Sequence, residues 1–177
     1  MTILGIKAYD RFLMNFVLPA AVVLLLFREP LRDYGFRWGN WKEGLAWTVA
    51  ACAVMALILW VVARRPEIAS YYKPKSADGF WRAVWKAGVD LFAWEFLWRG
   101  LTLFALARVA GPGTAIWLQA VPFSYAHLGK PEIETMSCIF GGAGFGFVAW
   151  KSQSFIYPFI IHVFITAWTI WVAMTFA

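Results

Sequence analysis

The chain has 177 residues, of which 62% are hydrophobic and 15% charged, and its mean hydropathy is +0.63. This composition excludes an ordinary soluble domain and predicts an integral membrane protein. The net charge of +6 is typical of basic loops that orient membrane spans. We therefore expect the lipid bilayer as a partner and no binding of nucleic acid.

Apolar stretches long enough to cross a bilayer recur along the whole chain. A helical span needs about 20 largely apolar residues. Six candidates follow one another, at residues 11–27, 43–63, 80–110, 112–128, 134–150 and 155–176. Strands are excluded because the segments lack the alternation of a membrane barrel. The predicted fold class is an all-α polytopic membrane protein with about six transmembrane helices in one bundle. We expect a single domain over residues 1–177, with a motif-bearing core at about 80–176.

The sequence before the first span shows no sign of a cleaved leader. The stretch MTILGIKAYDRF lacks a small-residue cleavage site, so we expect the first span to direct insertion. With six spans, more basic residues fall on the side of the membrane that holds both termini. The positive-inside rule therefore predicts cytoplasmic termini.

Several of these spans contain polar residues that a lipid-facing surface would not hold. A charged side chain at the centre of a span costs about 2.5 to 3.5 kcal/mol on insertion scales. In the third span Glu95 and Arg99 are four residues apart, on one face, and can form an ion pair. The two histidines of the chain, His127 and His162, lie in the fourth and sixth spans. Each group could have a purely structural role, but their presence on three spans favours a common polar pocket.

A carboxylate and two imidazoles together suit the activation of water. Glu95 can act as a general base, while one imidazole shares the proton of the water and the other donates to a developing oxyanion. This set of groups predicts hydrolysis of a peptide bond. Glu95, His127 and His162 could also hold zinc. The H-E-x-x-H spacing of soluble zinc proteases is absent, so we expect no metal and no cofactor.

Three short motifs occur in order along these spans: WEFLWR at residues 94–99, FSYAH at 123–127 and HVFIT at 162–166. With them the chain resembles the CPBP family of intramembrane proteases, the CAAX protease and bacteriocin-processing group. The motifs of that family are EExxxR, FxxxH, and HxxxN or HxxxD. The chain also looks like a bacterial subgroup in which WE replaces the glutamate pair, which implies a multi-pass protein of the inner (cytoplasmic) membrane.

The resemblance implies a hydrolase that cleaves a membrane-associated peptide or protein substrate within the membrane. Glu95 would be the base and Arg99 would fix it in place. His127 would help to position the water, and His162 with Thr166 would form the oxyanion side of the site.

Two positions depart from the family pattern. The first glutamate of the pair, which works with the histidine of the second motif on the attacking water, is Trp94 here. Neighbouring positions on a helix differ by about 100° in direction, so Glu95 cannot take that place without rotation of the helix. The terminal Asn or Asp is Thr166, whose hydroxyl replaces a stronger amide donor. The alternative is an inactive relative that serves as a scaffold or partner subunit of a membrane complex.

Overall fold

Helices form almost all of residues 7–176, the part of the chain that the computed structural model describes, and no strand forms in that range. The predicted all-α membrane fold is confirmed. Residues 1–6 and 177, which the predicted single domain and the N-terminal stretch include, lie outside the described residues. The elements are α1 (Lys7–Phe12), η1 (Leu13–Val17), α2 (Leu18–Ala21), η2 (Val22–Phe27), η3 (Leu31–Tyr34), α3 (Trp41–Val62), α4 (Pro66–Tyr72), η4 (Lys73–Ser76), α5 (Phe80–Glu95), η5 (Phe96–Thr102), α6 (Leu103–Ala110), α7 (Pro112–Tyr125), α8 (Glu132–Ser152) and α9 (Ile156–Phe176).

Local sequence signals set several of the helix boundaries. The Asn40 side chain caps α3 by accepting a hydrogen bond from the backbone N–H of Glu43, which satisfies one of the unpaired donors of a helix start. Helix α7 begins at Pro112, where the missing N–H of proline costs nothing. Helix α8 ends at Ser152, and the capping residue Gln153 that follows it adopts a left-handed conformation with φ of 55°.

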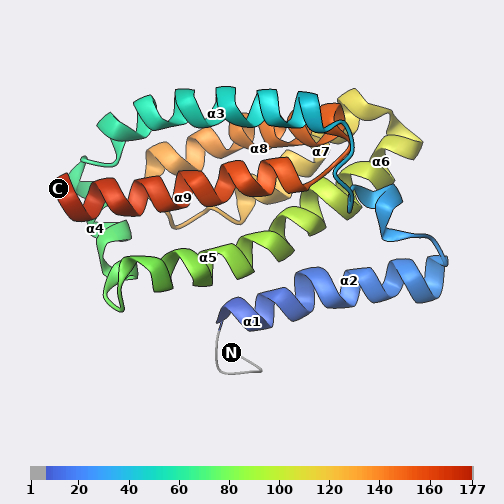
Figure 1. Ribbon diagram of the computed structural model, residues 1–177, viewed down its shortest axis with the longest axis horizontal. Helices are drawn as coiled ribbons and strands as arrows, with labels where there is room; N and C mark the ends of the chain where they lie inside the picture. Colours follow the sequence, from blue (N-terminus) through green and yellow to red (C-terminus); the bar gives the residue numbers. More distant parts are fainter. Residues whose placement is uncertain (1–6, 177) are drawn as a thin grey trace.

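Four helical segments are long and apolar enough to cross a membrane: Tyr9–Phe27, Trp41–Val62, Glu132–Ser152 and Ile156–Phe176. The other two predicted spans have a different form. Residues 80–110 are divided into α5, η5 and α6, and residues 112–128 contain α7, which has only 14 residues. Both regions nevertheless run alongside the long helices (Figure 1). Helix α7 is too short to count as a full span, and the region 80–110 contains five charged residues, Arg82, Lys86, Asp90, Glu95 and Arg99, before Arg108 near its end.

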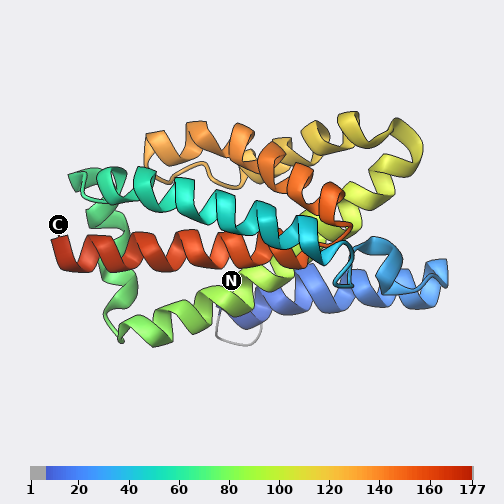
Figure 2. The ribbon, with the colours of Figure 1, turned by 45° about the horizontal axis from the view of Figure 1, so that its top comes forward.

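Helix α9 occupies the middle of the bundle (Figure 1). It contacts α3, α5 and α8, while α7 packs along α8 and α1 packs along α5. Figure 2 shows the same order from another side, with α7 and α8 on one side of α3 and the N-terminal helices at the opposite edge. The helices that carry the three motifs, α5, α7 and α9, are thus brought to one region.

Glycines allow two of these helix pairs to approach closely. In α3, a Cβ atom on Gly44 would overlap the ring of Tyr157 in α9, and that ring is buried. In α8, a Cβ atom on Gly146 would lie 2.5 Å from Nε2 of Gln119. That amide of Gln119 donates to the backbone oxygen of Gly142 at 2.8 Å. Both contacts limit the distance between the two helices of each pair.

The Gly44 contact gives a first prediction. Because an added methyl group has no room beside Tyr157, Gly44→Ala should lower the free energy of unfolding by about 1 to 3 kcal/mol. Thermal unfolding of the purified protein in detergent measures this. The control is Gly88→Ala in α5, where an added Cβ meets nothing within 4 Å, and which should be neutral or stabilising because alanine favours helix. Equal melting temperatures for the two variants would contradict the close approach of α3 and α9.

Candidate active site

A buried cluster of three charged or titratable side chains joins α5, η5 and α9. Glu95 and Arg99 are both completely buried, and the guanidinium Nε lies 3.2 Å from Oε2 of Glu95. The other carboxylate oxygen, Oε1, accepts a hydrogen bond from Nδ1 of His162 at 2.6 Å. The predicted ion pair between Glu95 and Arg99 therefore forms, and it is extended by a histidine from another helix.

The arginine of this cluster is held by aromatic rings as well as by the carboxylate. Its Cζ atom lies 3.9 Å from the ring centroid of Phe123 and 5.2 Å from that of Phe145. Cation–π contacts of this kind strengthen when water is excluded. Arg99 lies in η5, a π-helical segment that begins directly after Glu95, and π-helical turns often mark functional sites. Phe123, the aromatic residue of the second motif, thus supports the charged cluster directly.

His127 lies in the turn that follows α7, beside the same aromatic ring. Its ring centroid is 4.5 Å from that of Phe123, and its Nδ1 lies 2.7 Å from the backbone oxygen of Phe123. A carbonyl can only accept, so Nδ1 carries a hydrogen and Nε2 of the neutral ring is an acceptor. The hydroxyl of Thr135 donates to the backbone oxygen of His127 at 2.8 Å, which fixes the turn.

A polar cavity of about 650 Å³ opens beside this cluster. Four residues of the family motifs line it, and its wall also contains basic side chains from several elements. The motif residues are Trp94, His127, His162 and Thr166. Glu95 is not part of this wall, because it lies behind His162 and is fully enclosed.

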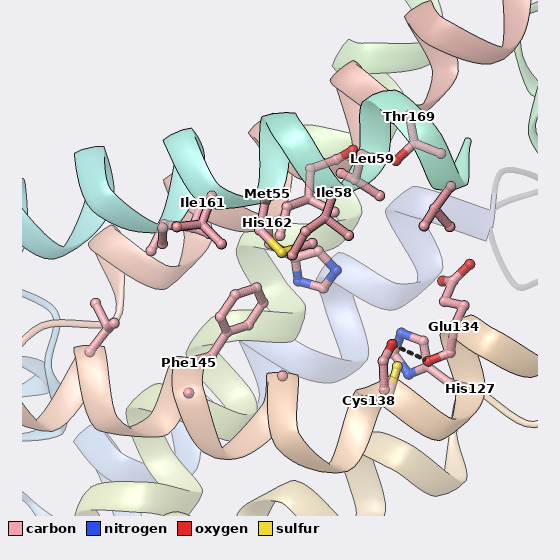
Figure 3. Close-up of a pocket in the computed structure, with 18 of the residues that line it drawn as sticks. Met55, Ile58, Leu59, His127, Glu134, Cys138, Phe145, Ile161, His162 and Thr169 are labelled. Carbon is pink, nitrogen blue, oxygen red and sulfur yellow. Dashed lines mark hydrogen bonds between the residues drawn. The ribbon is translucent and has the colours of Figure 1, made fainter. Parts of the chain in front are cut away.

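An apolar groove of about 620 Å³ lies on the other side of the two histidines, between α3, α8 and α9. Figure 3 shows His162 reaching from α9 into this groove, near Met55 of α3 and Phe145 of α8, while His127 lies near Cys138 and Glu134. Both histidines are lining residues of the groove and of the polar cavity. The imidazoles thus stand where an apolar compartment and a polar compartment meet.

Tyr72 is a third residue that lines both compartments, and no motif indicated it. Its hydroxyl lies 2.8 and 2.9 Å from the two carboxylate oxygens of Glu134 and donates to them. Burial, reinforced by the Glu134 carboxylate, raises the pKa of Tyr72, so the phenol stays protonated. Tyr72 lies in a polar connection between two predicted spans and in no motif, so the sequence alone does not distinguish it from an exposed surface tyrosine.

The predicted site residues thus fall into two groups. Glu95, Arg99 and His162 are in contact, while His127 and Thr166 join His162 on the wall of the polar cavity. Among the described residues 7–176, no group of three or more His, Cys, Asp or Glu side chains is arranged to hold a metal ion.

The buried pair gives a second prediction. Removing one partner leaves an uncompensated buried charge, so Glu95→Gln or Arg99→Met alone should cost about 3 to 5 kcal/mol of stability. The double variant should cost much less, since no charge remains and the new amide at position 95 still offers an oxygen to His162. Denaturant or thermal unfolding in detergent measures all three variants.

A matched control is Arg108→Met, which breaks a 2.6 Å ion pair with Glu29 whose partners are both partly exposed. Solvent screens that pair, so its loss should be small. Additive losses in Glu95→Gln and Arg99→Met would show that these two residues do not interact.

Comparison with known proteins agrees with the motifs. Residues 76–168 match the family model described as type II CAAX prenyl endopeptidase Rce1-like. No curated protein and no solved structure matches the chain. The matched segment is more than half of the chain and contains all three motifs. The chain therefore belongs to the Rce1-like type II CAAX prenyl endopeptidases of the CPBP family.

Proposed function

We propose that the protein is an active intramembrane endopeptidase that uses water to cleave a peptide bond of a membrane-associated substrate. The observation that carries this proposal is the position of His127 and His162, which both face a polar cavity and an apolar groove. Family membership supports a protease with a CAAX-type fold. The bond that is cleaved and the residues that act on it are inferred from the site.

His162 is suited to stabilise the oxyanion that forms when water attacks a carbonyl. Its Nδ1–H donates to the buried carboxylate of Glu95 at 2.6 Å, and that carboxylate can balance the positive charge of an imidazolium ring. In the imidazolium form the opposite nitrogen, Nε2, carries a hydrogen that it can donate toward the cavity. Thr166 lies one turn further along α9 and also lines the cavity. We therefore assign His162 and Thr166 to the oxyanion side.

His127 is suited to hold the attacking water. Its Nδ1–H is bound to the carbonyl of Phe123, so the lone pair of Nε2 can accept a hydrogen bond from a water in the cavity. Glu95 does not reach that cavity. We therefore assign Glu95 the role of fixing the orientation and charge of His162, with Arg99 as its partner, in place of the role of base that the motif suggested.

The two compartments suggest an amphipathic substrate. The groove between α3, α8 and α9 is lined almost entirely by apolar side chains and can accept a hydrocarbon chain. The polar cavity contains the basic residues Lys75, Lys86 and Lys130, which suit the carboxylate end of a peptide. We infer that the substrate is a lipid-modified or otherwise apolar peptide. Its cleavage would occur in a bacterial inner membrane, with both protein termini in the cytoplasm.

The third prediction tests this function with a farnesylated CAAX peptide that carries a quenched fluorophore, added to the purified protein in nanodiscs. His127→Ala and His162→Ala should each lower kcat by about 10² to 10⁴, because each removes a group that acts on the water or the oxyanion. Melting temperatures establish that the variants are folded. Tyr125→Ala is the control, since Tyr125 is exposed on α7 close to His127 and should retain full activity.

An inactive scaffold would give a different result. The wild-type protein would then release no fragment from the peptide, and both histidine variants would differ from it only in stability or in recovery of a bound membrane partner. That outcome would reject the endopeptidase proposal.

A further inference from the structure

The polar cavity contains one unexpected acidic group. In this family the first glutamate of the EE pair works on the water, but position 94 is a tryptophan here and Glu95 is enclosed behind His162. Among the residues that the structure describes, Asp90 is the one carboxylate in the cavity wall. It lies one turn before Trp94 on the same face of α5.

The packing of α5 against α9 places Asp90 in the wall of the cavity that the motif residues also line. The two helices are antiparallel neighbours (Figure 1), and they touch through Glu95 and His162. Asp90 lies five residues before Glu95, and Thr166 lies four residues after His162. A helix rises 1.5 Å per residue, so Asp90 and Thr166 each lie about 6 to 7.5 Å along the helix axis from the Glu95–His162 contact. Because the two helices are antiparallel, both shifts run in the same direction. Asp90 and Thr166 therefore stand at the same level of the cavity.

We propose that Asp90 replaces the missing glutamate as the catalytic base that receives the proton of the attacking water. This inference rests on the proposed endopeptidase function. As the water oxygen bonds to the carbonyl carbon of the substrate, one water proton passes to the Asp90 carboxylate and the carbonyl electrons move to the oxygen. His162 holds that oxyanion. When the oxyanion collapses, the carbon–nitrogen bond breaks and Asp90 returns the proton to the leaving nitrogen, which gives a carboxylic acid and an amine.

Arg11 positions this carboxylate. Its Nη1 lies 2.9 Å from Oδ2 of Asp90, and its Cζ lies 5.7 Å from the ring centroid of Trp94. Arg11 therefore reaches both the aspartate and the place where the family has a glutamate. It belongs to α1, outside the segment 76–168 that matches the family model. The N-terminal helix thus contributes to the site from outside the matched region.

The ion pair with Arg11 could also serve only to attach α1 to α5, so the test must separate the two roles. Asp90→Asn removes both the pair and the base, whereas Arg11→Gln removes the pair and keeps the carboxylate. With the farnesylated peptide in nanodiscs, we expect Asp90→Asn to lower kcat by about a hundredfold or more. Arg11→Gln should lower it only a few-fold, although both variants should lose similar stability. Equal losses of kcat in the two variants would overturn the proposal.

Restoring a carboxylate at position 94, where the family has a glutamate, is the sharper test. If Asp90 only attached α1 to α5, a new carboxylate at position 94 would not restore kcat. Asp90→Asn combined with Trp94→Glu should recover at least about tenfold in kcat over Asp90→Asn alone, since Arg11 can hold a carboxylate at either position. Asp90→Asn combined with Trp94→Gln has nearly the same shape without the charge and should not recover. Recovery in both double variants, or in neither, would contradict the role of Asp90 as base.

A measurement without substrate separates failure of the Asp90 inference from failure of the proposed endopeptidase function. The chain has only two histidines, so ¹⁵N-histidine labelling gives two assignable rings. If Asp90 and His127 share a water, the ring-nitrogen shifts of His127 should move in Asp90→Asn and return toward wild type when Trp94→Glu is added. Asp33→Asn, in η3 and outside the cavity, is the control. Unchanged His127 shifts in Asp90→Asn would overturn the inference whether or not the peptide is cleaved.

Discussion

The buried contact between Glu95, Arg99 and His162 is the constraint on which the arrangement of the motif helices depends. Removing a carboxylate and a guanidinium from water costs free energy of folding unless each group meets an opposite charge or a strong hydrogen bond. Here one carboxylate oxygen lies near Nε of Arg99 and the other accepts from His162. Because His162 comes from α9, the requirement to satisfy Glu95 fixes α9 against α5 at one height and one rotation.

Aromatic side chains extend this constraint to α7, the helix that carries the second motif. Phe123 stacks on the guanidinium of Arg99 and lies beside His127, so the position of the second histidine depends on the same buried charge. The two imidazoles then face a polar cavity on one side and an apolar groove on the other. The two compartments therefore meet at these imidazoles, which line both of them.

Position 94 departs from the family motif, and a carboxylate lies one turn before it on the same helix. Tryptophan at position 94 packs its ring near Trp98 and Phe123, so it fills space where the family has a charge. The nearest carboxylate on the same helix face, Asp90, lies one turn away and is held by a residue of the first helix. A helix face repeats every three to four residues, which allows an acidic group to move by one turn and still face the same cavity.

The sequence by itself determined the all-α membrane class, the ion pair between Glu95 and Arg99, and the family. Hydrophobic length, an i,i+4 spacing and ordered motifs are local properties that need no knowledge of contacts between helices. Only the structure decided that Glu95 is enclosed behind His162, that α7 ends at Tyr125 after 14 residues, and that Tyr72, Asp90 and Arg11 reach the cavity. These facts depend on the rotation and height of helices far apart in the chain, which are set by buried charges and close glycine contacts rather than by any local pattern.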